Sequence, residues 1–567
     1  MCGIIVMKAD KFSQKQRSLF LYSLKSLNPR GPDETRLVEK KNYLLGFTRL
    51  SINNLKNGSQ PFVSSCNRYV VLFNGEVLNY KILINQFENK IEFKSKNEVE
   101  LIINLYKIFG KKFVKHLRGF FSIVIIDLKL DEVFAAVDRF SIKPLYYVEK
   151  KDFFLFISDY SSLIKNGLVE NTLNLDKVSD YFTLAREFND ETIFKNIKKL
   201  EAATILTLNK KNKKKFYKYW QPFEIQNDST ISEERLIEEF DNQFLETTKL
   251  WQTAETKMSL SLSTGMDSNI IKMYLDKNRS QYTSFHLNEI NEFSFKSSNV
   301  KYLNKDLSLI KKLINKFTKS SLTPFAVSHS SSTSLFQLYN DIAQNGFKFT
   351  FNGEGADELF GGYSRYQKLL LLTKKNKMSL SKALVNLYKN EIEYYNSCLK
   401  KKQNNLFNKI EKKINKVNLL SKKIENKILE FDQLTWIPSL IQRHDIIGML
   451  YGVEVRPPFL DHHLVNKVNS LSLKQKYNVN KNKILLMKLF KKNNKKITYT
   501  SYKKLPTPTI YDLLINDKKE MKEFAEKFFY GKLSKIFLKN KILDDLNQSK
   551  LNKIFFWRLY ILNKMID

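Results

Sequence analysis

A cysteine occupies position 2, directly after the initiator methionine. Met1 is readily removed before a small residue, and its removal would leave Cys2 with a free α-amine. An α-amine has an ordinary pKa of about 7.7–8.0, so it can act as a general base near neutral pH. Cys2 would then carry the thiol nucleophile and its base in one residue. An ordinary buried cysteine is the alternative at this position.

A run of acids and glycines forms a second candidate for chemistry. Residues 353–363 read GEGADELFGGY and follow the apolar residues 347–351. Three acids so close together are costly to bury without a counter-charge, and Mg²⁺ with ATP would supply one. An acidic surface loop is the alternative.

A third candidate combines small hydroxyl residues, a glycine and an acid. Residues 262–268 read LSTGMDS, between an apolar run and a helical pattern. At such a turn the backbone N–H groups and the helix N-terminus can surround a phosphate. Asp267 could hold Mg²⁺ against that phosphate. The ordinary start of a capped helix is the alternative.

The segments that follow Cys2 carry a family resemblance. They are, in order, RGPD at 30–33, RLSI at 49–52, QP at 60–61, FNGEVLNY at 73–80 and DRFSIKPLYY at 138–147. Together they resemble the class II glutamine amidotransferases, which are N-terminal-nucleophile hydrolases, over residues 2–205. The resemblance makes Cys2 the nucleophile. Thiolate attack on a carboxamide generates an oxyanion, and the Asn74 side chain and the Gly75 N–H can donate to it.

The same resemblance predicts how glutamine is bound. Arg49 can form a forked contact with the α-carboxylate of glutamine, and Glu76 can accept from its α-ammonium. The family usually has Ser-Asp-x-Glu where this chain has SKNE at residues 95–98. Lys96 cannot accept a hydrogen bond, so Glu98 or a backbone carbonyl would have to compensate. The predicted glutamine-binding residues are Arg49, Asn74, Gly75, Glu76 and Glu98.

The second half of the chain resembles the asparagine synthetase family. Residues 353–363 match its acidic motif, and residues 262–268 resemble the Ser-Gly-Gly-x-Asp-Ser loop of ATP pyrophosphatases with Thr264 in place of the first glycine. The resemblance implies that Asp357, like Asp267, binds Mg²⁺ and that Glu354 deprotonates the attacking ammonia. The expected ATP-binding residues are Leu262, Ser263, Thr264, Gly265, Asp267, Ser268, Phe285, Asn352 and Gly353.

Two further segments are similar to the same family. Residues 454–463 read EVRPPFLDHH, preceded by Asp445, and we expect them to build a wall of the pocket. Residues 501–508 read SYKKLPTP and resemble an Arg-x-Lys segment with Ser501 in place of arginine. Lys503 then falls on the lysine that stabilises charge on the α-phosphate during adenylation, although Lys504 is adjacent.

Apolar runs predict the elements that position these residues. Stacked β-sheets are expected from the runs at 2–7, 43–45, 69–73, 120–126 and 133–137. From residue 232 helical patterns alternate with short strand candidates, which predicts a parallel α/β sheet. These strand candidates are residues 257–262, 281–286 and 347–351.

The predicted fold has two domains. An α+β N-terminal-nucleophile hydrolase sandwich (αββα) spans residues 2–205 and forms the glutaminase domain. Residues 206–230 are expected to be a linker, with the lysine-rich run 209–215 as a linker or a hairpin tip. Residues 231–567 form the asparagine synthetase-like α/β parallel-sheet ATP-pyrophosphatase domain. Within it, residues 400–430 predict one long amphipathic surface helix.

The composition excludes several classes of protein. Hydrophobic residues make up 43% of the 567 residues, so a largely disordered chain is not expected. The formal charge of +37 comes mainly from lysines spread along the chain without an RNA-binding signature, which indicates a solvated basic surface rather than nucleic-acid binding. No segment has the roughly 20 apolar residues of a membrane helix. Three cysteines and no signal peptide predict a cytoplasmic protein.

These observations predict an amidotransferase with two active sites. Cys2 would release ammonia from glutamine, and the second site would use ATP and Mg²⁺ to adenylate a carboxylate, with ammonia passing between the domains. Aspartate is the expected acceptor. A uronic acid of a surface polysaccharide is the alternative, because residues 287–306 lack some of the acidic pattern expected there. Small molecules are the expected partners, and a homodimer is compatible with the sequence.

Two related enzymes are disfavoured by the motifs, and a third interpretation is a protein that is not an enzyme. A purine-type amidotransferase would not carry the second domain's ATP loop, and a β-lactam synthetase relative would not have Cys2. A basic nucleic-acid-binding protein built on an inactive enzyme scaffold would show salt-sensitive polyanion binding without release of pyrophosphate.

Overall fold

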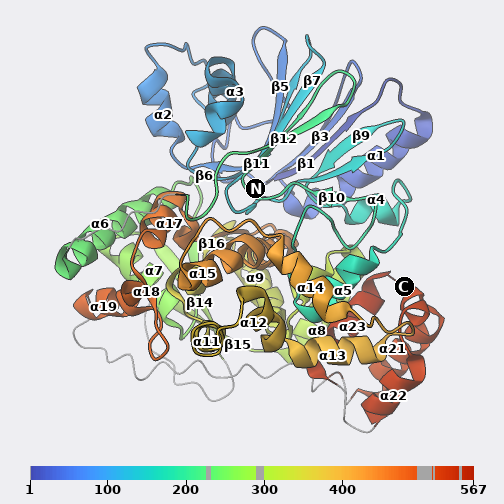
Figure 1. Ribbon diagram of the computed structural model, residues 1–567. Helices are drawn as coiled ribbons and strands as arrows, with labels where there is room; N and C mark the ends of the chain where they lie inside the picture. Colours follow the sequence, from blue (N-terminus) through green and yellow to red (C-terminus); the bar gives the residue numbers. More distant parts are fainter. Residues whose placement is uncertain are drawn as a thin grey trace.

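The computed structural model describes residues 2–224, 232–288, 299–493, 514, 517–547 and 552–566. The chain forms a β-rich part, drawn at the top of Figure 1, and a helix-rich part below it. The start of the chain lies at the junction between the two parts (Figure 1). Cys2 is therefore positioned close to the second part of the molecule.

The β-rich part contains two antiparallel six-stranded sheets. The first has the order β10 (Lys198–Lys199), β8 (Tyr146–Glu149), β9 (Phe154–Ile157), β1 (Cys2–Lys8), β3 (Tyr43–Arg49) and β2 (Glu34–Lys40). The second has the order β12 (Lys214–Lys218), β11 (Thr204–Leu208), β7 (Glu132–Val137), β6 (Gly119–Asp127), β5 (Tyr69–Val77) and β4 (Phe62–Val63). Every strand run predicted for this part lies in one of these strands.

Alternation along β1 explains how the layers stack. Ile4 and Val6 pack into the core between the sheets, whereas Ile5 and Met7 pack on the opposite face together with α1 (Gln14–Ser26). Helices α2 (Tyr80–Phe87) and α3 (Glu98–Phe109) cover the outer face of the second sheet. This order of helix, sheet, sheet and helix confirms the predicted αββα sandwich. The short helix α4 (Ser161–Lys165) packs against α1, whereas α5 (Leu175–Thr183) packs against α13 (Lys389–Cys398) and α23 (Lys553–Ile566) of the helix-rich part.

The second sheet continues beyond residue 205, where we predicted the first domain to end. Strands β11 and β12 pair antiparallel from Thr204–Lys218 to Leu208–Lys214. Leu206 and Leu208 are buried in the core between the sheets, so this hairpin cannot be a solvated linker. The predicted linker thus begins too early, and the lysine-rich run 209–215 spans the hairpin tip and the start of β12.

The helix-rich part contains a five-stranded parallel sheet. Its order is β15 (Val300–Asn304), β14 (Tyr282–Asn288), β13 (Met258–Leu262), β16 (Phe349–Phe351) and β17 (Glu454–Arg456). The strand candidates 257–262, 281–286 and 347–351 are confirmed as β13, β14 and β16. The chain runs from β13 outward to β15 and then returns to β16 on the other side. The strand order therefore reverses between β13 and β16, where such sheets bind ligands at the carboxyl ends of their strands.

Helices cover both faces of the parallel sheet. One face packs against α6 (Glu233–Trp251), α7 (Met266–Lys277), α17 (His462–Asn469) and α19 (Ile484–Asn493). The other packs against α8 (Leu307–Ser320), α9 (Ser334–Gln344) and α16 (Ile437–Met449). The remaining helices are α10 (Ala356–Phe360), α11 (Ser364–Leu370), α12 (Leu380–Leu387), α13 (Lys389–Cys398), α14 (Leu406–Asn415), α15 (Ile424–Thr435), α18 (Leu473–Lys476), α21 (Lys518–Tyr530), α22 (Lys539–Asn547) and α23 (Lys553–Ile566).

The long helix predicted over residues 400–430 is two helices, α14 and α15. Between them the backbone N–H groups of Leu420 and Ser421 donate to the carboxylate of Glu430 at 2.7 and 2.8 Å. Glu430 is fully buried, so these bonds satisfy its charge and hold the intervening segment out of a helical path. The helical spacing in the sequence did not reveal this break.

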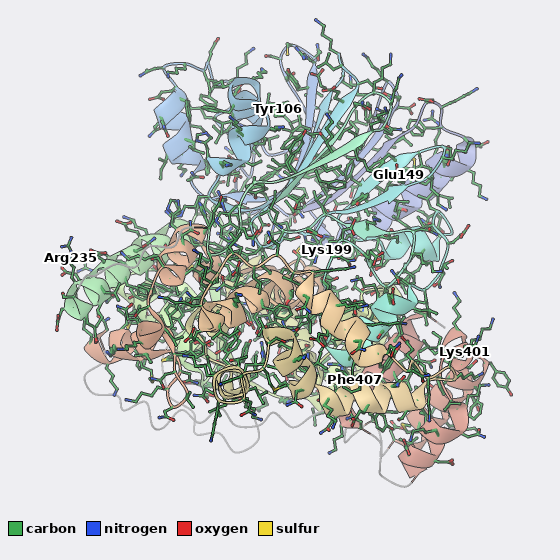
Figure 2. All side chains as sticks on the ribbon, in the orientation of Figure 1. Tyr106, Glu149, Lys199, Arg235, Lys401 and Phe407 are labelled. Atoms are coloured by element: carbon green, nitrogen blue, oxygen red, sulfur yellow. The ribbon has the colours of Figure 1, made fainter. Side chains whose placement is uncertain are left out.

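The basic side chains are distributed around the molecule. Figure 2 shows Arg235 and Lys401 at the periphery and Lys199 at the junction of the two parts. Lys199 binds Glu187 at 2.9 Å and contacts Gln442 of α16 at 3.4 Å. No helix in the described part of the chain is long and apolar enough to cross a membrane.

Candidate active sites

The first candidate site forms where β1, β3 and β5 meet. Cys2 lies directly opposite Arg49 in the β1–β3 pairing. The backbone N–H of Cys2 donates to Asn74 Oδ1 at 2.8 Å. The other end of the amide, Nδ2, has no hydrogen-bond partner among the described residues. Asn74 is fully buried, so its side chain presents an unsatisfied donor beside the thiol-bearing residue.

The environment of the Cys2 thiol favours its protonated form. Burial raises the pKa of the Cys2 thiol, and nearby Arg49 only partly opposes this effect. A protonated thiol needs an adjacent base before it can attack. The backbone nitrogen of Cys2 would become that base if Met1 is removed.

Gly75 occupies a position that only glycine fits. Its φ is +138°, and an added Cβ would lie 2.0 Å from the carbonyl oxygen of Phe120 in the neighbouring strand. The strand can therefore approach β6 closely at this point without a side chain in the way. The sequence signal, Asn-Gly after an apolar run, is explained by this packing.

Glu76 and Glu98 lie together in a buried, acid-rich environment. Glu76 accepts from the Asn53 amide, and Glu98 accepts from the Val77 N–H at 2.6 Å and from the Asn54 amide at 3.3 Å. Burial, with Glu454 nearby, raises the pKa of Glu76 to about 7. Burial and the charge of Glu76 raise the pKa of Glu98 well above its ordinary value. A cation such as an ammonium group would stabilise the ionised forms of these two carboxylates.

Lys96 points away from this acidic pair. Its side chain is 61% exposed, and Nζ lies 3.5 Å from Glu88 on the surface. Arg49 donates to the backbone carbonyl of Asn54 at 2.6 Å, so it lies beside the same loop that contacts Glu98. The structure thus brings together the predicted residues Cys2, Arg49, Asn74, Gly75, Glu76 and Glu98, and excludes the Lys96 side chain.

The second candidate site lies at the carboxyl ends of β13 and β16. The loop after β13 is closed by a bond of 3.0 Å between the hydroxyls of Ser263 and Ser268. Neither Thr264 nor Gly265 has a positive φ, so threonine is compatible with this loop. A Cβ on Gly353 would lie 2.7 Å from Cβ of Asp267, which shows how tightly the two loops approach. Leu262 ends β13, and Asn352 follows β16.

Asp267 and Asp357 converge on one cation. Lys483 Nζ lies 2.6 and 2.7 Å from the two carboxylate oxygens of Asp267 and 2.5 Å from Asp357 Oδ1. These two acids raise the pKa of Lys483 despite its burial. Two carboxylates that share a single cationic point are suited to a divalent ion, with phosphate oxygens as further ligands. Among the residues described, no group of three metal-ligating side chains occurs.

Glu354 contacts two side chains of α16. Its Oε1 lies 2.8 Å from His444 Nε2 and 3.4 Å from Arg443 Nη2. Arg443 also donates to Ser332 at 3.3 Å, and its Nε has no hydrogen-bond partner among the described atoms. A base, a cation and an unsatisfied donor therefore lie together next to the loops that hold Asp267 and Asp357.

The 454–463 segment lies at the junction between the two parts. Arg456 binds Glu454 at 2.6 Å, and Asp461 accepts from Arg118 at 2.7 Å and from Trp251 at 2.9 Å. Asp445 binds Arg30 at 2.8 Å. The segment expected to wall the pocket thus also attaches the second part to the first.

For two predicted site residues, the structure shows no side chain at the site. Phe285 lies in β14 with its side chain fully buried 5.4 Å from the ring of Phe347, so only its backbone is available to a nucleotide. Lys503 lies outside the described residues.

Sequence reasoning missed Arg443, His444, Tyr339 and Lys483. For the first two a signal exists, since Gln442, Arg443, His444 and Asp445 are four consecutive polar residues in a mostly apolar, buried helix. A polar run in such a helix requires partners. Lys483 follows other lysines and asparagines, and no pattern distinguishes it from them.

One cavity lies beside residues of the second candidate site, and a larger one does not. A gap of about 180 Å³, too narrow for a water molecule, lies between the parts beside Ile142, Asn352, His444 and Asp445. A wider cavity of about 670 Å³ is lined by residues of both parts, including Glu187, Lys199, Trp220 and Lys413. No predicted site residue lines the wider cavity.

Comparison with protein families matches both parts of the chain. Residues 1–220 match the family model described as a glutamine amidotransferase domain, and residues 239–557 match the model described as asparagine synthase.

Individual relatives are similar over most of the chain. Glutamine-hydrolyzing asparagine synthetase 2 of Bacillus subtilis is 27% identical, covering 82% of this chain and 66% of its own, and asparagine synthetase 3 is 24% identical, covering 86% and 84%. The amidase chyE of Penicillium rubens is 25% identical, covering 80% and 79%. The chain thus spans just under two thirds of the first of these relatives.

A solved glutamine phosphoribosylpyrophosphate amidotransferase from B. subtilis is 15% identical, covering 50% of this chain and 65% of its own. Its TM-score of 0.30 is too low to support a conclusion. The asparagine synthase model, by contrast, covers more than half of the residues. The chain therefore belongs to the asparagine synthase family and carries a glutamine amidotransferase domain ahead of its synthase domain.

Proposed function

We propose that this chain converts aspartate to asparagine, with glutamine as nitrogen donor and ATP as the energy source, through an acyl-adenylate. The observation that carries the proposal is the convergence of Asp267 and Asp357 at the switch point of the parallel sheet, with Glu354 in the same loop as Asp357. The relatives named asparagine synthetases support the choice of aspartate.

In the first site, Cys2 would attack the carboxamide of glutamine. After removal of Met1, the α-amine takes the thiol proton, and the proton leaves with ammonia as the thioester forms. The unsatisfied Nδ2 of Asn74 and the Gly75 N–H donate to the oxyanion. Arg49 holds the α-carboxylate of glutamine, and Glu76 and Glu98 hold its ammonium. Water then hydrolyses the thioester to release glutamate.

In the second site, an oxygen of the aspartate side-chain carboxylate would attack the α-phosphorus of ATP. The bond to pyrophosphate breaks, and Lys503 stabilises charge on the α-phosphate. The backbone from Leu262 to Ser268, with Asn352, Gly353 and the Phe285 backbone, surrounds the nucleotide. Asp267 and Asp357 would hold Mg²⁺, which neutralises phosphate charge when bound. Lys483 lies at the same convergence point and contacts the same oxygens.

Amide formation would complete the reaction. The ammonia nitrogen forms a bond to the acyl carbon, Glu354 accepts a proton from that nitrogen, and the carbon–oxygen bond to AMP breaks with its electron pair on the phosphate oxygen. The products are asparagine, AMP and pyrophosphate.

A second candidate acceptor is another carboxylate, such as a uronic acid. Arg443, at 3.4 Å from Glu354, is partly exposed, as are Arg365 and Trp436 of the same part, and the Arg365 guanidinium lies 5.3 Å from the Trp436 ring. Arginines and an aromatic ring suit an anionic sugar as well as an amino acid. Asp432, which binds Arg186 and Arg365, has its oxygens occupied.

A panel of acceptors tests the proposal. The chain is incubated with ATP, Mg²⁺, glutamine and either aspartate, glutamate, succinate or galacturonic acid, and AMP, pyrophosphate and the amide are measured. Formation of AMP and asparagine with aspartate alone supports the first candidate. Turnover with galacturonic acid but not aspartate establishes the second. Hydrolysis of ATP to ADP with every acceptor would refute adenylation.

A further inference from the structure

Helix α16 contributes a histidine to the predicted base of the synthetase site. His444 is 4% exposed and precedes Asp445, which binds Arg30 of the first part. Its Nε2 lies 2.8 Å from Glu354 Oε1. Its Nδ1 lies 2.5 Å from the hydroxyl of Tyr339 in α9. His444 therefore bridges Tyr339 and Glu354 in one chain of contacts.

The chemistry of these groups fixes their donor directions. Ionised Glu354 can only accept, so the contact of 2.8 Å requires His444 Nε2–H to donate to it. Arg443 Nη2 lies 3.3 Å from the same nitrogen, and since arginine can only donate, this longer contact is not a hydrogen bond in that tautomer. In the neutral imidazole the other nitrogen, Nδ1, is then an acceptor and takes the Tyr339 O–H. Tyr339 thus selects the tautomer of His444, because the hydrogen bond made by one ring nitrogen determines which nitrogen carries the proton.

Burial keeps both His444 and Tyr339 neutral. Burial lowers the pKa of His444, although Glu354 opposes the shift. Burial raises the pKa of Tyr339 well above its ordinary value, so the hydroxyl remains a donor. A neutral donor orients a carboxylate without adding a positive charge that would weaken it as a base. Arg443, at 3.4 Å, is the cation next to the same oxygen.

We infer that His444, held in one tautomer by Tyr339, is a positioning residue that orients the Glu354 carboxylate to accept the proton of the attacking nitrogen. This inference rests on the proposed function. His444 keeps its own proton throughout, and the proton from ammonia goes to Glu354. The role concerns amide formation only, because adenylation of the acceptor requires no base at Glu354.

The two half-reactions separate this role from a merely structural one. Adenylation is followed by aspartate-dependent exchange of labelled pyrophosphate into ATP. Amide formation is followed by asparagine production from aspartate and ammonium chloride, so Cys2 is not needed. The variants are His444→Ala, which removes the donor, His444→Gln, whose amide can restore a donor near the Nε2 position, and Tyr339→Phe, which removes one hydroxyl. His116→Ala, at an exposed histidine whose ring contacts Phe109 of the first part, is the matched control.

The expected result is a selective loss. A lost hydrogen bond to a charged group slows the step that depends on it by roughly 10- to 100-fold, so His444→Ala should lower kcat for amide formation by that factor. Pyrophosphate exchange should stay within about threefold of the parent chain. His444→Gln should recover most of the loss, and Tyr339→Phe should lose about three- to tenfold in amide formation. His116→Ala should change neither half-reaction.

Several results would overturn the inference. Equal losses in exchange and amide formation, or a His444→Gln chain no more active than His444→Ala, would mean that His444 only supports packing. Thermal unfolding identifies a variant that fails to fold, and Tyr339→Phe, the smallest change, then decides the question. A parent chain without exchange for any acceptor would refute the proposed function and the inference with it. Exchange in the parent chain without a selective loss would refute the inference alone.

Discussion

The guanidinium of Arg456 lies 3.8 Å from the carboxylate of Glu76, across the boundary between the synthase sheet and the amidotransferase sheet. Both side chains are buried, and Arg456 also binds Glu454 at 2.6 Å. One arginine is therefore shared by an acid of its own strand and an acid predicted to bind glutamine. The charge state of the glutamine site is consequently tied to the synthase domain.

The raised pKa of Glu76 predicts a pH-dependent affinity for glutamine. Glu76, with a pKa of about 7, is ionised above that pH and neutral below it. Between pH 8 and pH 6 its ionised fraction falls about tenfold, so the KM for glutamine should rise by about the same factor. Glutamine keeps its ammonium charge over this range. A constant glutamine KM from pH 6 to 8 would show that Glu76 does not bind the ammonium.

The raised pKa of Glu76 also makes the stability of the fold depend on pH. The folded chain holds the Glu76 proton up to about pH 7, whereas the unfolded chain releases it near the ordinary value of 4.5. The contribution of Glu76 to stability is therefore fully present below about pH 4.5 and is lost as the pH rises through 7. A Glu76→Gln variant should lose this dependence in urea unfolding at pH 5 and pH 8.

Cys2→Ala should affect glutamine-dependent synthesis but not ammonia-dependent synthesis. Glutamine-dependent synthesis should be abolished because the only thiol beside Asn74 in the described site is removed. Ammonia-dependent synthesis should stay within about threefold of the parent chain, because sites far apart act nearly independently. Both are measured as product formation with glutamine or ammonium chloride. Cys66→Ala, at an exposed cysteine, should change neither, and equal loss with both donors would contradict the two-site model.

The sequence predicted the parts of the fold and site that depend on local patterns. Strands such as β1 and β6 are nearly continuous apolar runs, and the loops after β13 and β16 are marked by glycines, hydroxyls and acids. The order of these motifs predicted the two kinds of sheet and several of the side chains that lie together at the two candidate sites. Asn74, Glu76 and Glu98 converge as expected because their segments are neighbouring parts of the second sheet and α3.

The rest depended on contacts between distant segments. The Lys483 contact with Asp267 joins residues 216 positions apart, and the Arg30 contact with Asp445 joins residues 415 apart. No local pattern encodes such pairs. The predicted end of the first domain at residue 205 lies too early because Leu206 and Leu208 of β11 are buried between the sheets, and the break before α15 depends on one buried acid, Glu430.

Lys96→Asp should lower the KM for glutamine. The Lys96 side chain extends to solvent, so it leaves the predicted ammonium site without the acid that the family has there. An added acceptor for a cation contributes about 1.5–3 kcal/mol where it is well placed, so the KM should fall by roughly 10- to 100-fold. Lys96→Ala is the matched control and should leave the KM unchanged. An unchanged KM in Lys96→Asp would mean that Glu76 and Glu98 already complete the site.

Asp357→Asn should impair both nitrogen routes. It removes one of two carboxylates that converge with Asp267 on a single cationic point, and loss of a ligand for the phosphate-bound cation should reduce aspartate-dependent pyrophosphate exchange about 100-fold or more. Raising Mg²⁺ should restore part of the activity. Asp545→Asn, at an acid paired with Lys541 on α22, should have no effect. Unchanged exchange in Asp357→Asn would disprove the metal assignment.

Asp445→Asn should destabilise the chain at the junction of its two parts. Asp445 is buried, binds Arg30 at 2.8 Å and lies 3.5 Å from Lys143, so its neutralisation leaves two buried cations without their counter-charge. Breaking a buried pair in this way costs about 3–5 kcal/mol, which urea unfolding would detect as a lower free energy of unfolding. Asp33→Asn is the matched control, because the pair of Asp33 with Lys348 also joins the two parts but is partly exposed. An exposed pair contributes at most about 1 kcal/mol.

A combined variant distinguishes the loss of counter-charge from the loss of packing. Arg30→Met, Lys143→Met and Asp445→Leu together replace the buried charges by apolar side chains of similar size. Such replacements are often neutral or stabilising, so the triple variant should recover most of the stability that Asp445→Asn loses. If the triple variant were as unstable as Asp445→Asn, the ion pairs would be needed for packing at the junction. If Asp445→Asn and Asp33→Asn lost the same small amount, Asp445 would not carry the charge balance of the junction.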